Sequence, residues 1–496
     1  MPRYDAVVIG AGNGGLTSSL TLARKGLKVM LLERHNIPGG CGTSFMRGRF
    51  EFEVALHQLS GLGRETMPGP LRDLLGRLGI IEKLKFIEMK TMYRLVVLNQ
   101  LDITLPADRA GTIGVLKERF PGESDNIDRF FDMLYALCME WVGAIVLHDP
   151  EASKAKYPTY CKYAFKPVRD VMDEYFKDPL LKAVVASYWG YLGLPPSRLS
   201  FSDLAIVIWA YLEYKPWHLR GGSQAMSSAI LDEFMKAGGE VRFNCEAKQI
   251  LVKDGQVTGV VTQDDDTLET DYVVSNAGTI KTMVDLVGPE ATPAEHMKEL
   301  SSQTIGTSGF TVYMGFDREP KDLGIHETTN FICTSIDAEA AFAAGKTLSV
   351  PQWMLLTAYD VDDPEFSPAG ASQAALVALQ YGEPWLSLPP SQYFETKYRV
   401  ADGMLSIAEQ VFPGLREHIE ELEVATPLTH MRYLGHPAGA IYGQEQFAKD
   451  STMFSEMRSH IRGLYCAGAW VGLGGFQPTL ESGNAAAKAV LKAMHE

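Results

Sequence analysis

The stretch that decides the fold is residues 6–15, AVVIGAGNGG, near the start of the chain. Its first four residues are apolar and mostly β-branched, which is typical of a buried parallel strand. The glycines that follow fit the pattern GxGxxG at Gly10, Gly12 and Gly15. Apolar residues then recur at helical spacing, and Gly26 stands where a helix would end. The stretch therefore predicts a strand, a tight turn and a helix.

The spacing of the glycines indicates a dinucleotide site. Gly10 makes the tight turn, Gly12 lets the backbone approach a pyrophosphate, and Gly15 permits close packing of helix on strand. A second apolar strand at 29–32 ends at Glu33, which can accept hydrogen bonds from ribose hydroxyls. GxGxxG alone is weak evidence in a chain with 46 glycines. With strand, helix and acid in place, the dinucleotide site is favoured over the alternative that the acid is a solvated strand-end carboxylate.

Two further glycine-rich segments favour FAD over NAD. Gly39 and Gly40 follow the acid closely, which suits a longer cofactor that continues past the first βαβ unit. Near the C-terminus, the glycine-rich segment 464–478 precedes a helical pattern from about Thr479. The amides at the start of that helix would face a flavin edge that becomes negative on reduction.

The composition excludes several classes of protein. The chain has 496 residues, 46% of them hydrophobic, and a formal charge of −15, which argues against nucleic-acid partners. Six scattered cysteines without a CxxC pair predict reduced thiols, and eleven histidines without HExxH or clustering predict no metal site. The sequence enters a strand at once and has no apolar run of about 18 residues, so we expect no signal peptide and no spanning helix. From the reduced thiols and the lack of an expected signal peptide or spanning helix, we expect a cytoplasmic location.

The three glycine-rich segments lie far apart, so the cofactor domain must be assembled from discontinuous pieces. Apolar or alternating runs at 310–316 and 374–380 suit antiparallel strands. We expect an α/β protein, α+β overall, with a Rossmann-like FAD-binding domain and a substrate domain of mixed or antiparallel sheet and helices. The predicted boundaries are 1–78, 215–306 and 440–496 for the FAD-binding domain, and 79–214 and 307–439 for the substrate domain.

Motifs along nearly the whole chain agree with one flavoprotein superfamily. Besides the segments above, they are residues 50–52 leading to His57, 191–197, 220–224, 238–241 leading to Ala247 and Ile250, 273–277, 439–443 and 465–483. On these motifs the sequence resembles the phytoene desaturase, carotenoid isomerase and retinol saturase group of FAD-dependent oxidoreductases, within the amine-oxidase-like superfamily. One departure is Ala247, which stands where the family has an adenine-contacting valine.

The resemblance implies an FAD-dependent oxidoreductase and a substrate with carbon–carbon double bonds in a polyene, isoprenoid or other lipid-like skeleton. We expect the FAD to be non-covalent, because neither Cys41 nor Cys466 stands in a context that resembles a known attachment site. Desaturation, saturation and cis–trans isomerisation all need the same cofactor fold, so the sequence leaves the three open. The cofactor residues expected from the motifs are Gly10, Gly12, Asn13, Gly14, Gly15, Glu33, Arg34, Gly39, Gly40, Thr43, Ser44, Ala247, Gly468, Ala469, Gly475, Phe476 and Gln477.

His57 and Tyr442 are the candidates for proton transfer. His57 matches a family position near the flavin, and Tyr442 is flanked by glycine-rich backbone that allows close approach to a ring. The alternatives are a core histidine bonded to backbone and a structural tyrosine. The chain has only one complete GxGxxG and no CxxC, so we expect oxygen, a quinone or a redox protein as electron acceptor rather than a bound nicotinamide.

Two other functions suit the same fold. An amine-oxidase-like enzyme acting on a C–N bond needs an aromatic cage for a neutral amine, and tyrosines are plentiful. A non-catalytic protein that binds prenyl lipids would often lack the dinucleotide fingerprint, which is complete here. A yellow preparation with bound FAD would favour an enzyme over a binder.

Basic and aromatic residues alternate at 154–169, directly after the apolar run 141–147. The pattern fits a contact with lipid headgroups where a hydrophobic substrate enters. It equally fits a solvated helical face whose cations offset acidic neighbours. Peripheral membrane contact is therefore one of two interpretations of this stretch.

Overall fold

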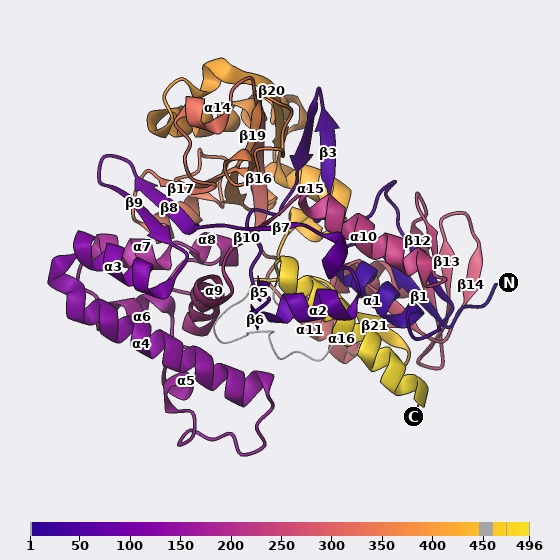
Figure 1. Cartoon of the computed structure of the whole chain (residues 1–496). Helices are drawn as coiled ribbons and strands as arrows, with labels where there is room; N and C mark the ends of the chain where they lie inside the picture. The colour runs from indigo at the N-terminus through magenta and orange to yellow at the C-terminus, as the bar shows by residue number, and fades with distance from the viewer. Residues whose placement is uncertain (1, 446–459, 473, 496) are drawn as a thin grey trace.

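A parallel sheet carries the predicted dinucleotide motif. The computed structural model of the chain describes residues 2–445, 460–472 and 474–495. Figure 1 shows this sheet and its helices at one end of the molecule, around the chain termini. Its strands are parallel in the order β11 (Glu240–Arg242), β2 (Val29–Leu32), β1 (Ala6–Ile9), β15 (Val273–Ser275) and β21 (Leu464–Cys466). The Rossmann-like part of the predicted fold is confirmed.

Three helices cover this sheet: α1 (Asn13–Ala23), α10 (Gly222–Lys236) and α16 (Phe476–His495). The backbones of α1 and α16 approach so closely that a Cβ at Gly483 would overlap the carbonyl oxygen of Gly14. Helix α16 begins three residues before the expected Thr479, because Pro478 is tolerated in the first turn of a helix.

A second sheet of seven strands forms the other half of the core. Its order is β20 (Ile419–Ala425), β16 (Ser308–Phe316), β19 (Ser372–Gln380), β18 (Trp353–Ala358), β17 (Thr329–Cys333), β8 (Thr91–Val97) and β9 (Leu101–Pro106). All neighbours pair antiparallel except β17 and β8. The predicted mixed sheet is confirmed, and the runs at 310–316 and 374–380 are antiparallel neighbours, as expected.

The two faces of this sheet meet different partners. Side chains such as Met354 and Leu356 pack on α14 (Tyr393–Val411), while the alternate residues Trp353 and Leu355 face the opposite way. A layer of helices lies on that opposite side (Figure 1). It consists of α3 (Arg109–Arg119), α4 (Ser124–Trp141), α5 (Pro158–Tyr163), α6 (Val168–Tyr175), α7 (Pro179–Ala186), α8 (Trp189–Leu192) and α9 (Phe201–Tyr214).

Smaller elements connect the two halves. A hairpin of β3 (Ser44–Arg47) and β4 (Phe50–Glu53) leads from the cofactor motif toward the seven-stranded sheet, and α15 (Pro427–Leu434) leads back. The remaining strands and longer helices are β5 (Gly63–Arg64), β6 (Met67–Pro68), α2 (Pro70–Arg77), β7 (Phe86–Glu88), β10 (Trp217–Leu219), β12 (Ala247–Lys253), β13 (Gln256–Thr262), β14 (Thr267–Glu269), α11 (Ala294–Ser302), α12 (Ala338–Ala344) and α13 (Glu383–Leu386).

The strands of the two sheets fall into different predicted segments. Those of the parallel sheet lie within 1–78, 215–306 and 440–496, and those of the seven-stranded sheet within 79–214 and 307–439. The domain boundaries themselves stay a prediction. No helix in the described part of the chain has the length and apolar character needed to cross a membrane.

We expect Gly483→Ala to destabilise the fold by about 1–3 kcal/mol, because the added methyl group overlaps the Gly14 carbonyl and separates α1 from α16. Thermal unfolding measures the effect. Gly76→Ala in α2 is the matched control, because no atom of the described residues lies within 4 Å of its Cβ position and alanine favours the helix. A Gly483→Ala protein as stable as that control would contradict the close packing.

Candidate active site

One large cavity runs from the parallel sheet to the seven-stranded sheet. It encloses about 2340 Å³ of space outside the atoms, its open mouth included. At one end it begins at the carboxyl ends of β1 and β2, where open α/β sheets bind ligands. At the other end it reaches strands β16, β18 and β19. We call these ends the nucleotide end and the chamber.

Glycine backbone forms the wall of the nucleotide end. Gly10, Gly12 and Gly14 line it, and the side chain of Asn276 lies so close to Gly12 and Gly14 that a Cβ on either residue would overlap it. Within the described part of the chain, no side chain caps the N-terminus of α1, whose N-cap residue is Gly12. The first amides of this helix are therefore available to an anion such as a phosphate.

Glu33 stands at the end of β2 with its carboxylate largely buried. The backbone N–H of Ala11 donates to its Oε2 at 2.6 Å and that of His35 donates to its Oε1 at 2.7 Å. These bonds hold the carboxylate at the cavity wall, and its remaining lone pairs can accept further donors. Glu33 thus ties the two strand ends together in addition to its predicted role toward a ribose.

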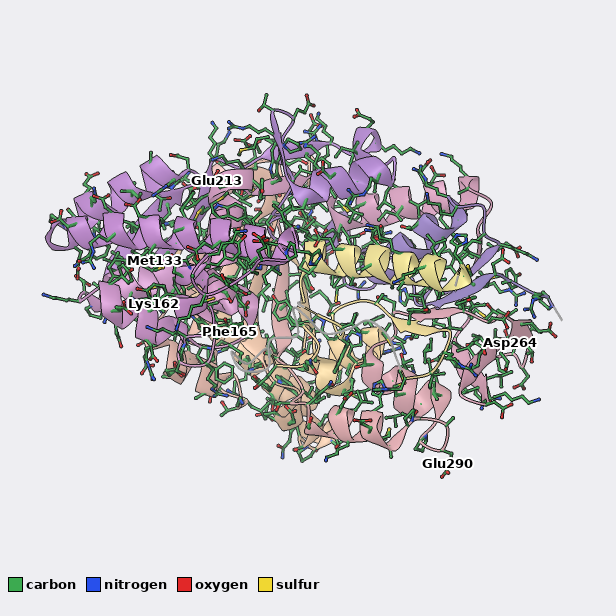
Figure 2. All side chains as sticks on the ribbon, turned by 90° about the horizontal axis from the view of Figure 1, so that it is seen from below. Met133, Lys162, Phe165, Glu213, Asp264 and Glu290 are labelled. Atoms are coloured by element: carbon green, nitrogen blue, oxygen red, sulfur yellow. The ribbon has the colours of Figure 1, made fainter. Side chains whose placement is uncertain are left out.

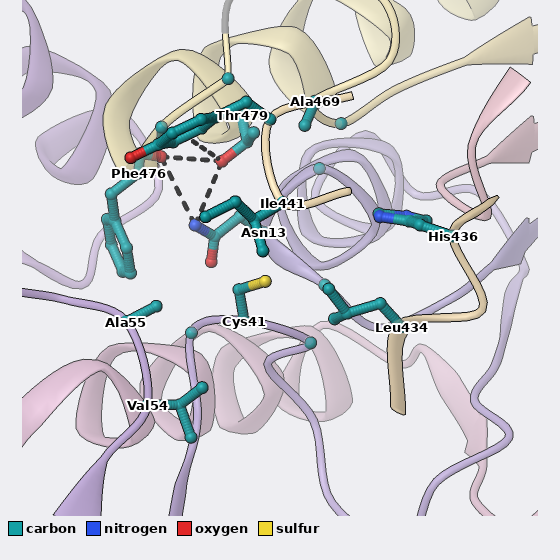
Figure 3. A pocket seen from close by; sticks show the side chains of 18 of the residues that line it. Asn13, Cys41, Val54, Ala55, Leu434, His436, Ile441, Ala469, Phe476 and Thr479 are labelled. Atoms are coloured by element: carbon teal, nitrogen blue, oxygen red, sulfur yellow. Dashed lines mark hydrogen bonds between the residues drawn. The ribbon is translucent and has the colours of Figure 1, made fainter. Parts of the chain in front are cut away.

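The turn at the start of α16 meets the start of α1. Asn13 donates from Nδ2 to the carbonyl oxygen of Phe476 at 3.4 Å and to Oγ1 of Thr479 at 3.2 Å. Figure 3 shows this junction above Cys41, with His436 on a separate segment to the right, and all of these residues line the cavity. Two helix N-termini therefore point into one region of the cavity, which favours negative charge there.

Most of the predicted cofactor residues line this cavity. They are Gly10, Gly12, Asn13, Gly14, Glu33, Arg34, Gly39, Gly40, Ala247, Gly468, Ala469, Gly475, Phe476 and Gln477. Gly15 is outside the lining, because it packs on the Gly10 carbonyl, as its predicted packing role requires. Thr43 and Ser44 do not line the cavity, since their hydroxyls bond instead to Gln224 and Glu51.

Charge divides the cavity into two parts. Among the described residues that line it, the charged ones are Glu33, Arg34, Glu246 and Lys281. Lys281 pairs with Glu246 at 3.0 Å, and Glu246 follows Cys245, whose N–H donates to the Glu33 carbonyl. All four therefore belong to the nucleotide end. The chamber is lined by neutral side chains.

The chamber lies on the face of the seven-stranded sheet opposite α14. Its floor consists of alternate residues on three neighbouring strands: Gly309, Thr311, Trp353, Leu355, Val377 and Leu379. Helices α8 and α9 contribute Tyr191, Leu192, Val207 and Tyr211. Sequence reasoning named none of these as site residues, although the motifs 191–197 and 273–277 contain Tyr191, Leu192 and Asn276. The motif around Asn276 was visible, but the strand residues carry only the pattern of a core.

His57 and Tyr442, which the sequence singled out, both line the cavity. Nδ1 of His57 is 3.0 Å from the Thr357 hydroxyl and 3.3 Å from the Tyr359 hydroxyl, so Nε2 is the ring nitrogen left to act on a bound molecule. Burial lowers the pKa of His57 to about 4. The imidazole is neutral at physiological pH.

Tyr442 lies between two glycines, with a Cβ at Gly474 coming 2.8 Å from its ring and one at Gly193 coming 3.4 Å from it. Glycine at 474 gives the ring its space, whereas a Cβ at Gly193 would make ordinary van der Waals contact with it. Burial raises the pKa of the Tyr442 phenol to about 12, so it stays protonated and can donate a hydrogen bond.

A group of polar side chains gathers around Gln58 on the wall near α8 and α9. The hydroxyls of Tyr188 and Tyr191 each donate to its Oε1 at 3.3 Å, and its Nε2 donates to the Met92 carbonyl at 2.6 Å. These contacts hold the wall in place. Burial holds the pKa values of both tyrosines well above the usual range, so these hydroxyls stay neutral.

The basic and aromatic stretch at 154–169 does not contribute to this cavity. Lys162 and Lys166 pair with Glu174 at 3.0 and 3.1 Å, while Phe165 is 54% exposed. Figure 2 shows Lys162 and Phe165 on the helical end of the molecule, away from Asp264 at the other end. Contact of this stretch with a membrane stays a prediction.

Comparisons with known proteins agree on the family. A family model described as flavin containing amine oxidoreductase matches residues 14–491. The chain belongs to this family. It is 26% identical to an all-trans-retinol 13,14-reductase of Danio rerio, over 96% of this chain and 84% of that protein. It is also 26% identical to prolycopene isomerase 2 of an Oncidium hybrid cultivar, over 94% of this chain and 80% of the isomerase.

A solved structure of an oxidoreductase from Methanosarcina mazei superposes over the whole of both chains with a TM-score of 0.66 and 17% identity, which supports the same fold. Membership of the flavin containing amine oxidoreductase family implies a flavin, and the residues fit one. The glycine wall leaves room for a phosphate, the uncapped α1 provides free amides, and the start of α16 faces the same region.

We expect the free energy of unfolding to depend on pH through His57. Its pKa is about 4 in the folded chain and near 6.5 when unfolded, so stability is complete above pH 6.5 and falls as the pH drops toward 4. In the His57→Gln variant, the free energy of unfolding should fall by up to about 3 kcal/mol less between pH 6.5 and pH 4 than in the wild type. Urea titrations across this range measure the effect. His148, which is exposed, is the control, and its replacement by Gln should leave the slope unchanged.

Proposed function

We propose that the chain is an oxidoreductase that binds FAD non-covalently and acts on carbon–carbon bonds of an apolar polyene or isoprenoid substrate. The observation that carries this proposal is the division of the cavity. The charged nucleotide end suits a dinucleotide, and the chamber offers apolar and aromatic side chains with a few neutral polar groups. Such a lining favours a hydrophobic substrate over a charged one.

The names of the relatives support the substrate class. One relative is a reductase named for all-trans-retinol and another is an isomerase named for prolycopene. Both names describe proteins that act on conjugated hydrocarbon chains. Reduction, dehydrogenation and isomerisation all stay open for this chain.

The chain's own residues would bind, orient and protonate the substrate. Bound FAD would supply hydride or single-electron transfer at its N5 atom. His57, neutral and held at Nδ1, would offer Nε2 to a reacting carbon or its neighbour. Tyr442 would donate its phenolic proton, and the chamber would exclude water.

An amine substrate is the alternative. The tyrosines of the chamber could form an aromatic cage for a neutral amine. Most aliphatic amines are protonated at neutral pH, however, and among the described residues of the chamber no carboxylate is present to pair with them. A non-catalytic lipid carrier is a second alternative, and the intact cofactor wall argues against it.

For the electron acceptor we infer oxygen, a quinone or a redox protein. The described chain has one dinucleotide-type βα unit of the GxGxxG pattern, which the flavin would occupy. We further infer a reducing compartment such as the cytoplasm, because all six cysteines are free.

The test of the proposed function begins with the purified protein. We expect a yellow protein that releases FAD into the supernatant on acid precipitation, and an isoprenoid or polyene in its solvent extract by mass spectrometry. Anaerobic mixing with NADH or NADPH should bleach the flavin slowly or not at all. A colourless protein, or a flavin that stays in the denatured pellet, would contradict non-covalent FAD; co-purified amines would favour the alternative substrate.

We expect Glu33→Gln to weaken FAD binding about ten- to a hundredfold, because hydrogen bonds to a charged acceptor contribute roughly 1.5–3 kcal/mol. The dissociation constant from flavin fluorescence measures the loss, and the melting temperature reports on the strand-end contacts of Glu33. Glu240→Gln is the control, since Glu240 bonds the Tyr4 hydroxyl outside the cavity. Unchanged affinity in Glu33→Gln would remove the residue from the ribose site.

A further inference from the structure

The indole ring of Trp353 forms part of the chamber wall on β18, the strand whose Thr357 bonds His57. Trp353 and Leu355 line the chamber from β18, and Thr357, on the same face of that strand, bonds His57. Trp353 lies four positions before Thr357, which at about 3.3 Å per residue corresponds to about 13 Å. A substrate lying along this strand from His57 therefore meets Trp353.

A second cavity lies directly behind that ring. It spans about 280 Å³ of space outside the atoms, any opening to solvent included, and has room for about one water molecule. Trp353 and Leu379 line both it and the chamber. Its other lining residues are Trp189, Ala341, Phe342, Gly345, Pro351 and Tyr381. These side chains are apolar or aromatic like those of the chamber, so a hydrocarbon chain would meet similar surroundings on both sides of Trp353.

Packing alone holds the indole in place. Its ring lies against Gly190, where a Cβ would overlap Cζ2 and Cη2, and it contacts Trp189 and Phe331 at ring-centre distances of 5.4 and 5.3 Å. Its Nε1 is buried without a hydrogen-bond partner among the described residues. A smaller side chain at this position would therefore break no hydrogen bond and would join the two cavities.

We propose that Trp353 limits the length of the substrate by closing the chamber off from the cavity behind it. This inference rests on the proposed function, because it assumes a hydrophobic chain in the chamber. Gly190 takes part by giving the indole its space, and Leu379 completes the wall. Trp353 is thus a specificity-determining residue that lies away from the reacting groups.

The test compares the binding of polyprenols of increasing length to the FAD-loaded protein. Farnesol, geranylgeraniol and solanesol are titrated, and the change in flavin absorbance gives each dissociation constant. In the wild type, affinity should rise with length until the chain reaches Trp353 and then fall. Trp353→Ala should move the optimum to a longer alcohol and improve solanesol binding relative to the shortest by about tenfold or more, since even one methylene group changes discrimination by 10–200-fold.

Two further variants keep the test decisive. Trp353→Phe retains a ring in the core but lacks the atoms that contact Gly190, so it should shift the optimum in the same direction even if the alanine variant does not fold. Phe342→Ala enlarges the second cavity on its Tyr381 side, away from the indole, and should leave the optimum unchanged. An optimum that stays in place in both folded Trp353 variants would overturn the inference and leave the proposed function intact. Failure of every polyprenol to bind the wild type would overturn both.

Discussion

Contacts that only glycine permits, at the turn between β1 and α1, are the constraint on which the rest of the structure depends. Gly15 packs directly on the carbonyl of Gly10, and Gly14 packs on Gly483 of α16. These contacts bring the first helix against the parallel sheet and the last helix against the first. The N-termini of two helices far apart in sequence consequently face one region, which is the nucleotide end of the cavity. A side chain at any of these glycines would push the helices apart and open that wall.

The seven-stranded sheet has two functions because its residues alternate between its faces. One set packs on α14 and forms a core, and the other set forms the floor of the chamber. The shape of the chamber is therefore tied to the stability of the sheet. Substitutions on the floor change the cavity directly, whereas those on the opposite face act through packing.

Burial also sets the chemistry of the chamber. His57 and Tyr442 are both uncharged at neutral pH, the first because its pKa falls on burial and the second because its pKa rises. Neutral donors beside a hydrophobic substrate can move a proton without placing a net charge in an apolar cavity.

The sequence by itself determined the dinucleotide fold, because its signals are local. The apolar run before Gly10, the glycine spacing and Glu33 at the end of the second strand each depend on neighbours within a few residues. Motif resemblance also led to His57 and Tyr442, which the structure places in the cavity. It also named Thr43 and Ser44, which lie outside the cavity lining, because a polar residue beside a glycine turn does not reveal that Gln224 and Glu51 will bond it.

Only the tertiary structure decided the chamber. Its residues come from α8, α9, β16, β18 and β19, and each of these elements has the apolar pattern of an ordinary core. Alternation along a strand tells which residues share a face, but it does not tell what covers that face. Whether Trp353 fills a core or closes a cavity depends on Gly190 and on the space behind it, and these lie in segments that meet only after the chain has folded.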